Sequence, residues 1–272
     1  MDMGIITPGF DNMIIVRGGG DLATGVVQKL FRARLPVLIL ETPAPTAIRR
    51  SVSLCEAIYD GVMRVEDITS KRVAGPDEME ECFRKGLVPV IADPAGDMIS
   101  ILRPAAVIDA IVAKRNLGTN RDMAGVTIAL GPGFYAGRDV HAVIETQRGH
   151  NLGRLILQGH ASPDTGNPGS ISGESARRVL HAPVSGIVVH NKRIGDVVEC
   201  GETLFMVGRE EIRAPFTGLL RGLIREMTEV YEGMKIADVD PRTDVDWRTI
   251  SDKARCIGGT ALEAYYMLRN RK

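Results

Sequence analysis

The stretch that most restricts the fold is MIIVRGGGDLATGVVQKL, residues 13–30, in which three glycines join a short apolar run to a helical pattern. Residues 13–17 are expected to form a strand, and residues 20–34 a helix with apolar positions three and four residues apart. The run LPVLILE, which ends at Glu41, is typical of a strand buried on both faces of a parallel sheet. Strand, helix and strand in this order predict a βαβ unit.

The glycine loop admits two interpretations. Gly18, Gly20 and Ala23 match GxGxxA, a variant of the dinucleotide-binding fingerprint, and Glu41 ends the next strand, where an acidic residue commonly binds ribose hydroxyls. Asp21 favours a structural turn, because a carboxylate at a helix N-terminus can cap the free amides and repels phosphate. The arginine before the first glycine could neutralise either that carboxylate or a phosphate. A phosphate-binding loop and a tight turn both stay open.

The same patterns predict further elements. Helices are expected at residues 49–60, 76–85 and 103–116, and strands at 87–93, 125–130, 139–146 and 153–159.

A second glycine cluster, GPGFYAG, follows the strand at 125–130, where the backbone amides of open α/β sheets bind ligands. Downstream, His141 and Glu145 have the spacing of one strand face, and Arg148, His150 and Arg154 follow. Three interpretations stay open. The segment could be a hairpin of hydrogen-bonded polar residues, an anion or cofactor pocket that uses the arginines, or a His–Glu–His metal site, for which no fourth ligand is evident.

Arg49 and Arg50 either begin a solvated helix or reach the ligand of the first loop, and Asp93 follows a strand end. Because the carboxyl ends of parallel strands lie at one edge of a sheet, the residues that follow strand ends are expected to converge there. They are Gly18 to Asp21, Glu41, Asp93 and Gly131 to Phe134. The predicted cofactor-binding residues are Arg17, Gly18, Gly20, Asp21, Ala23, Thr24, Glu41, Arg49, Arg50, Asp93, Gly131, Gly133, Phe134, Arg148, His150 and Arg154. No catalytic residue is assigned, and no metal site is predicted.

The second half of the chain contains a loop-forming stretch and an internal repeat. Residues 161–177, rich in Gly, Pro and Ser, are predicted to form a loop or linker, whose part around Thr165 to Gly169 is long enough to act as a lid. Beyond it, APVSGIV recurs 32 residues later as APFTGLL, and the offset continues along both copies. The repeat predicts a small pseudo-symmetric β module. The last segment is expected to be a helix capped by Ser251 or Asp252.

The composition of the chain argues against some classes of binding partner. The formal net charge is zero and the pI is about 7.0, which argues against a nucleic-acid-binding protein. The four cysteines form no CxxC pair and indicate reduced, mostly buried thiols. Neither a signal peptide at the start nor an apolar run of membrane-spanning length is evident. A cytoplasmic protein that binds no membrane is expected.

Several long motifs resemble those of accessory proteins of the selenium-dependent molybdenum hydroxylase system, over nearly the whole chain from Met13 onward. They are RGGGDLATG, DPAGDMISILRPAAVIDAIVAKRN, LGPGFYAGRDVHAVIETQRGHNLGRLI, DTGNPGSISGE and GMKIADVDPR…ISDKARCIGG. The resemblance implies a factor that helps to make or load a molybdenum hydroxylase of the xanthine dehydrogenase kind. The repeat resembles biotinyl and lipoyl carrier domains, but its turn, ETLFMVGREEIRAP, lacks the lysine that those carriers modify.

We therefore expect an α/β fold in four parts. Residues 13–160 would form a Rossmann-like nucleotide- or cofactor-binding domain, 161–177 the linker, 178–240 a barrel-sandwich (biotinyl-like) module and 241–272 the C-terminal helix.

The expected function is maturation of a selenium-dependent molybdenum hydroxylase, with NAD(P) or a molybdopterin-type cofactor bound and neither biotin nor lipoate. The expected partner is the hydroxylase apoenzyme, and a homo-oligomer is compatible with the sequence. Two alternatives stay open: an NAD(P)-dependent oxidoreductase, whose acid or base would be His141, His150 or Asp93, and a non-enzymatic protein-binding scaffold.

Overall fold

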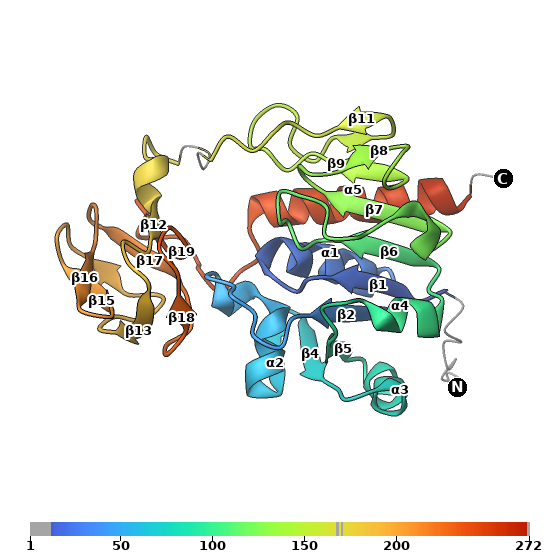
Figure 1. Cartoon of the computed structure of the whole chain (residues 1–272), viewed down its shortest axis with the longest axis horizontal. Helices are drawn as coiled ribbons and strands as arrows, with labels where there is room; N and C mark the ends of the chain where they lie inside the picture. The colour runs from blue at the N-terminus through green and yellow to red at the C-terminus, as the bar shows by residue number, and fades with distance from the viewer. Residues whose placement is uncertain (1–11, 167–168, 170, 271–272) are drawn as a thin grey trace. The chain divides into compact units, whose positions relative to one another are not determined.

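The structure is a computed structural model that describes residues 12–166, 169 and 171–270 (Figure 1). The chain divides into two compact units. The α/β unit comprises the described residues of Met1–Pro45, Ser53–Asp164 and Ile250–Lys272, and the β unit comprises those of Thr46–Val52 and Thr165–Thr249. The β unit is thus inserted into the sequence of the α/β unit.

The α/β unit is built on a nine-stranded sheet in the order β10-β9-β7-β6-β1-β2-β5-β4-β3. Six neighbouring pairs, from β9 to β4, are parallel, and the two outermost pairs are antiparallel. The strands are β1 (Ile14–Arg17), β2 (Val37–Glu41), β3 (Val62–Val65), β4 (Ile68–Arg72), β5 (Val88–Ala92), β6 (Ala106–Asp109), β7 (Val126–Leu130), β9 (Ala142–Ile144) and β10 (Leu155–Ile156). A separate antiparallel pair joins β8 (Tyr135–Ala136) to β11 (Gly159–His160).

The chain builds this sheet first on one side of β1 and then on the other. From β1 it proceeds to β2, then to β3 at the far edge and back through β4 to β5, and it finally places β6, β7 and β9 on the other side of β1. This reversal lies between β1 and β6, which are parallel neighbours paired from Ile14↔Ala106 to Arg17↔Asp109. Ligands of open α/β sheets bind at the carboxyl ends of the strands at such a point.

Five helices and several 3₁₀ turns accompany the described strands. The helices are α1 (Asp21–Arg32), α2 (Ala57–Asp60), α3 (Pro76–Arg84), α4 (Asp97–Leu102) and α5 (Asp252–Arg269), and the 3₁₀ turns are Arg50–Val52, Leu54–Glu56, Arg121–Met123 and Ala176–Arg178. Helix α3 begins at Pro76, a residue that suits the first helical position. The predicted cap of α5 is confirmed, because Ser251 Oγ accepts the Ala254 N–H.

Helix α5, from the end of the chain, packs side by side with α1 (Figure 1). The contact depends on two glycines. A Cβ atom on Gly25 would overlap the Ala254 carbonyl oxygen, and one on Gly258 would overlap the Gly25 carbonyl oxygen. The two backbones therefore approach more closely than any side chain would permit.

The helix predicted at residues 103–116 is wrong. Ala106–Asp109 is instead the buried strand β6, and a loop follows in which Val112 and Lys114 have positive φ. The segment VID is as typical of a doubly buried strand as of an apolar helix face, because short apolar runs do not distinguish the two. The residues between β6 and β7, all of which the structure describes, form the 3₁₀ turn Arg121–Met123 and no α-helix.

Two other predictions need correction. The helix predicted at 49–60 is limited to short turns and the four-residue α2, and β3, β4 and α4 were not anticipated. The cysteines were expected to be mostly buried, but only Cys55 and Cys82 are; Cys200 and Cys256 are exposed.

The β unit consists of two four-stranded antiparallel sheets, ordered β12-β19-β17-β14 and β16-β15-β13-β18. Side chains of both sheets, among them Val188, Phe205, Leu220 and Val239, form one core. The strands are β12 (Val179–His181), β13 (Gly186–His190), β14 (Val197–Val198), β15 (Thr203–Val207), β16 (Glu210–Arg213), β17 (Gly218–Leu223), β18 (Glu229–Val230) and β19 (Lys235–Asp240).

The strands of the β unit follow the 32-residue offset seen in the sequence. Strand β17 begins 32 residues after the start of β13. Strand β18 lies 32 residues after β14 at both ends. The pair Val188↔Val207 in one sheet corresponds to Leu220↔Val239 in the other. Each sheet takes its fourth strand from the other repeat, since β14 pairs with β17 and β18 with β13.

Within the described part of the chain, every helix is too short or too polar to cross a membrane.

Candidate functional site

The first glycine loop lies at the reversal point and is held tightly there. Gly18 has φ of +92°, and a Cβ atom on it would lie 3.0 Å from the Ala110 carbonyl oxygen. A Cβ on Gly19 would lie 3.0 Å from the Cβ and the backbone nitrogen of Cys55. Both positions need glycine because backbone segments on either side leave no room for a side chain.

Gly20 differs from its two neighbours. A Cβ atom placed on Gly20 would meet nothing within 4 Å, and its φ of −67° suits any residue. It is the N-cap of α1, and no side chain caps that helix end. The start of α1 thus offers backbone amides beside open space, an arrangement that favours an anion. Asp21, in the first turn, opposes an anion there.

Glu41 contacts this loop directly. Its Oε2 accepts the Gly19 N–H at 2.8 Å, and its Oε1 accepts the Thr42 N–H at 2.8 Å. Burial raises the pKa of Glu41, and these two N–H groups partly counteract the rise. The Glu41 carboxylate thus holds the glycine loop in place. Its two oxygens have further lone pairs, which are the acceptors that ribose hydroxyls would need.

A buried polar network lies under the same point. Arg17 Nη1 donates to Thr119 Oγ1 at 2.6 Å, and that hydroxyl donates to Asp109 Oδ2 at 2.6 Å. Arg17 Nη1 is 3.9 Å from Asp109 Oδ2, and Arg17 Nη2 donates to the Pro94 carbonyl oxygen at 3.4 Å. All three residues of the network are at most 4% exposed. The network links the ends of β1 and β6 to the loop after β6.

The sequence analysis missed Asp109 and Thr119. The wrong helix at 103–116 placed Asp109 in the middle of a helix, whereas it is the last residue of β6. Burial raises the pKa of Asp109, and the Thr119 hydroxyl, the Ile111 N–H and the charge of Arg17 partly counteract this. An aspartate at the end of an apolar run was the signal that could have identified it.

The Asp93 side chain forms hydrogen bonds with the backbone. Its carboxylate accepts the N–H groups of Gly96, Asp97 and Met98 at 2.9, 3.1 and 2.9 Å. Its own N–H donates to the Glu41 carbonyl oxygen at 2.9 Å, which joins it to the glycine loop. These contacts explain Asp93 as a stabilising residue at the start of α4, and a ligand contact stays a prediction.

The second glycine cluster lies at the same sheet edge, because β7 and β1 run in the same direction. The backbone N–H groups of this cluster are less available to a ligand than those of the first glycine loop. Gly131 N–H donates to the Ile144 carbonyl oxygen at 2.8 Å, and a Cβ on Gly131 would lie 2.5 Å from Thr146 Oγ1. A Cβ on Gly133 would lie 2.7 Å from the Arg115 backbone, and Phe134 is buried. Close packing accounts for these glycines.

The polar residues after this cluster have separate partners. His141 Nδ1 accepts the Thr127 N–H at 3.0 Å, and burial lowers the pKa of His141. Glu145 accepts the N–H groups of Gln147 and Ser162, each at 2.7 Å. These contacts match the hairpin interpretation. Among the described residues, no group of three or more His, Cys, Asp or Glu side chains could hold a metal ion.

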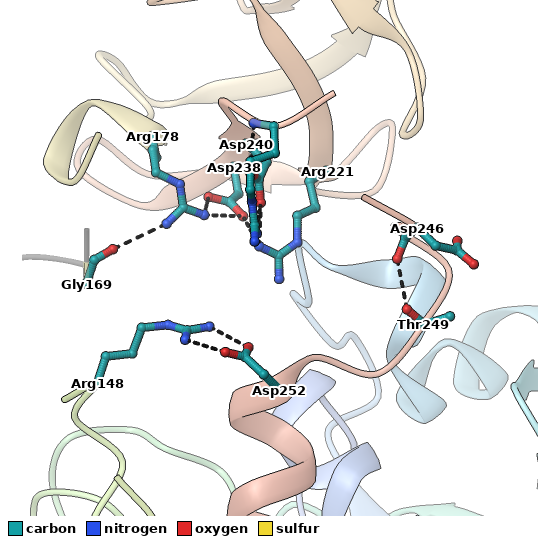
Figure 2. Close-up of polar contacts among 10 residues, drawn as sticks. Arg148, Gly169, Arg178, Arg221, Asp238, Asp240, Asp246, Thr249 and Asp252 are labelled. Carbon is teal, nitrogen blue, oxygen red and sulfur yellow. Dashed lines mark hydrogen bonds and ion pairs between the residues drawn. The ribbon is translucent and has the colours of Figure 1, made fainter. Parts of the chain in front are cut away.

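Arg148 forms two hydrogen bonds with the Asp252 carboxylate, at 2.8 and 2.9 Å (Figure 2). The pair ties the segment after β9 to the first residue of α5. His150 and Arg154 are exposed. A ligand role for these three residues stays a prediction.

For the remaining predicted site residues, Ala23, Thr24, Arg49 and Arg50, a ligand role stays a prediction. Ala23 and Thr24 are buried, and Thr24 Oγ1 donates to the Gly20 carbonyl oxygen and accepts the Leu54 N–H. Arg49 and Arg50 belong to the β unit, where Arg50 Nε donates to the Leu223 carbonyl oxygen at 2.8 Å. The lid predicted around Thr165 to Gly169 includes residues 167 and 168, which lie outside the described part of the chain.

A cavity of the α/β unit adjoins the buried network. It is lined by residues of α4 and of the turn before β7, including Gly96, Ile99, Arg103, Asn120 and Asp122. Gly96 also lies beside Arg17, since its Cβ position would be 3.7 Å from Arg17 Nε. None of the predicted cofactor-binding residues lines this cavity.

A second polar cluster lies inside the β unit (Figure 2). Arg178 Nη2 donates to both oxygens of Asp238, at 3.0 and 3.3 Å, and Arg221 Nη1 donates to Asp240 Oδ2 at 2.9 Å. Arg242 Nε and Nη2 donate hydrogen bonds to the two oxygens of Asp240, at 2.9 and 2.8 Å. Asp240 is fully buried and Asp238 is 6% exposed. The sequence analysis did not single out this cluster.

The β unit is expected to lose stability in acid through Asp240. Burial raises the pKa of this carboxyl, but hydrogen bonds from Arg242 and the charges of Arg221 and Arg242 outweigh burial and lower the pKa to about 2. Because the unfolded-state value is about 3.9, the unfolded chain binds the proton more tightly. The stabilisation, about 2 kcal/mol, is complete above about pH 4 and lost as pH falls towards about 2.

Denaturant unfolding between about pH 2 and 5 measures this effect. The Asp240→Asn variant is expected to show a shallower loss of stability with acid than the unmodified protein. Asp244→Asn, a change at an exposed position of the same unit, is the control. Equal slopes for Asp240→Asn and the unmodified protein would contradict the prediction.

Comparisons with known proteins give one close sequence relative. No family model matches the chain. The protein of Escherichia coli described as "Uncharacterized protein YqeB" is 47% identical over 262 residues, which cover 96% of this chain and 48% of that protein. The chain therefore spans about half the length of this curated relative.

Two solved structures give weak matches. An aspartoacylase family protein from Mesorhizobium loti is 12% identical, with 84% of this chain and 85% of that chain covered and a TM-score of 0.28. A succinylglutamate desuccinylase from a Silicibacter species is 12% identical, with 84% of each chain covered and a TM-score of 0.24. Neither match is close enough to support an inference about fold or function.

Proposed function

We propose that the α/β unit is a Rossmann-like domain that binds a phosphate-bearing cofactor, a nucleotide or a molybdopterin-type molecule, at the first glycine loop. The strand order supports this proposal. Seven neighbouring strands are parallel. Six of them, β1, β2, β5, β6, β7 and β9, numbered along the chain, lie in the order 3-2-1-4-5-6, which is the order of dinucleotide-binding sheets, and β4 is added outside β5.

One observation carries the proposal: Gly20 begins α1 at the reversal point, with open space beside it and no side-chain cap on the helix. The neighbouring glycines are explained by packing, but Gly20 is not. A glycine in that position is needed where a phosphate approaches the backbone. Glu41 would then face the ribose or an equivalent polar part of the cofactor.

The wider role follows from the resemblance to accessory proteins of the selenium-dependent molybdenum hydroxylase system. We propose that the protein helps to load or mature such a hydroxylase, with the hydroxylase apoenzyme as its partner. The β unit would be a barrel-sandwich module of the biotinyl kind that contacts proteins. Because the turn between β15 and β16 has no lysine, it would carry neither biotin nor lipoate.

The test of the cofactor site compares two N-cap glycines. Gly20→Val is expected to weaken cofactor binding at least tenfold, about 1.4 kcal/mol, because its side chain would occupy the phosphate position. Gly75→Val is the matched control, since Gly75 is the N-cap of α3 and its Cβ position is also open. Mass spectrometry of the purified protein identifies any bound cofactor, and calorimetry with NAD, NADP and pyrophosphate measures affinity.

Equal binding by Gly20→Val and the unmodified protein would show that the loop is only a turn. A nicotinamide cofactor together with substrate-dependent hydride transfer would favour the oxidoreductase instead. The maturation role is tested in cells: loss of the protein is expected to lower the activity of the hydroxylase, and Gly20→Val is expected to fail to restore it while Gly75→Val restores it.

A further inference from the structure

We propose that Arg221 anchors a second binding site, in the β unit, for an oxyanion group, which is the carboxylate or phosphate of a small molecule. This site is independent of the cofactor site proposed above. The proposal begins from the hydrogen bonds of the Arg221 guanidinium, which is the central cation of the cluster drawn in Figure 2.

Within the described part of the chain, Arg221 forms hydrogen bonds through one of its three nitrogens. Nη1 donates to Asp240 Oδ2 at 2.9 Å and lies 3.9 Å from Asp238 Oδ2. Nε and Nη2 have no hydrogen-bond partner among the described residues, although the side chain is only 10% exposed. The N–H groups of Nε and Nη2 lie on one edge of the guanidinium and form the fork that matches the two oxygens of a carboxylate or phosphate.

The nearby carboxylates do not block an incoming anion. Asp238 is paired with Arg178, and Asp240 is gripped by the corresponding fork of Arg242. The five side chains together hold three guanidinium groups and two carboxylates. Each carboxylate thus has an arginine of its own, and Arg221 supplies a further positive charge with a free fork.

The internal repeat shows that the fold does not need these charges. At the 32-residue offset, Arg221, Asp238 and Asp240 correspond to Val189, Met206 and Gly208 in the first copy. The first copy forms the same strand pair with apolar or small residues at these positions. The charges are therefore an addition to one half of a pseudo-symmetric unit.

The backbone differs between the copies at the same place. In the first copy, β13 and β15 pair without interruption from Val188↔Val207 to His190↔Phe205. In the second, the register of β17 against β19 shifts between Leu220 and Gly222, so Arg221 is the extra residue of a bulge. Bulges redirect a side chain and are common beside functional sites. Nε and Nη2 of Arg221 keep some exposure to solvent, so an oxyanion could reach both and accept their N–H groups.

The experiment titrates the full chain with sodium phosphate and, separately, with sodium acetate at constant ionic strength. Nuclear magnetic resonance follows the Nε–H signals of the arginines. The Arg221 signal, assigned by its loss in Arg221→Lys, is expected to shift and saturate with at least one anion. A larger effect with phosphate or with acetate identifies the ligand class.

Arg221→Lys keeps the charge and removes the fork, so it is expected to bind the anion about tenfold more weakly or worse. Arg209→Lys, at an exposed position of the same unit, is the control and is expected to bind as the unmodified protein does. The proposal is overturned if neither anion gives a saturable shift, or if the shifts fall on other arginines and not on Arg221. The first of these two outcomes is read on the unmodified protein and needs no folded variant.

Discussion

Replacing Gly258 by alanine is expected to lower the free energy of unfolding of the α/β unit by about 3 kcal/mol, the upper end of the usual cost of overpacking. The new Cβ would overlap the Gly25 carbonyl oxygen, which is backbone and cannot rotate away. Helices α1 and α5 would have to separate, and the apolar contacts along both would loosen. Denaturant unfolding followed by circular dichroism measures the loss.

The next residue in the same helix is the control. Gly259 is exposed, and a Cβ atom there would meet nothing within 4 Å. Gly259→Ala is expected to stabilise the protein by about 0.5–1 kcal/mol, because alanine is the better helix former. If the two variants changed stability in the same direction, the close approach of α1 and α5 would be wrong.

Replacing Arg17 by methionine is expected to cost about 3–5 kcal/mol, the usual loss when one partner of a buried ion pair is removed. Asp109 would keep the Thr119 hydroxyl and the Ile111 N–H but would lose its nearby positive charge. Because burial already raises the pKa of Asp109, the variant would favour the protonated acid more strongly. Its deficit is therefore expected to shrink as pH falls.

Denaturant unfolding at about pH 7 and 5 tests both parts of this prediction. Arg154→Met, at an exposed position, is the control and is expected to change stability by less than about 0.5 kcal/mol. The double variant Arg17→Met/Asp109→Leu is expected to recover much of the loss, since no charge is then left buried. A double variant as unstable as Arg17→Met alone would argue against the ion pair as the cause.

Much of the α/β unit could be predicted from local patterns. The first strand, the helix after the glycine loop and the strand that ends at Glu41 each carry an unambiguous signal, and the structure confirms them. The segment 103–116 could not be assigned in this way. Its apolar residues suit either a helix or a buried strand, and pairing with β1 and β7, which are distant in sequence, decides for the strand.

The candidate site was predictable only in part, for the same reason. Gly18, Gly20 and Glu41 are close in sequence and share a recognised spacing. Asp109 and Thr119 join Arg17 only because β6 lies beside β1, and nothing local in the sequence shows that neighbour. Arg221 escaped notice because a bulge has no sequence signature, and only the comparison of the two repeat copies makes its charge stand out.

The insertion of the β unit ahead of α5 has a consequence during synthesis on the ribosome. Helix α1 ends at Arg32, but its partner α5 begins at Asp252, about 220 residues later. At roughly 5–20 residues per second, the apolar face of α1 would stay uncovered for about 10–45 s while the rest of the chain emerges. The strands of the small β unit all lie between Val179 and Asp240, so this unit can complete its own core within that interval. We therefore expect the nascent chain to expose the apolar face of α1 until α5 has been made, and chaperones to shield that face in the interval.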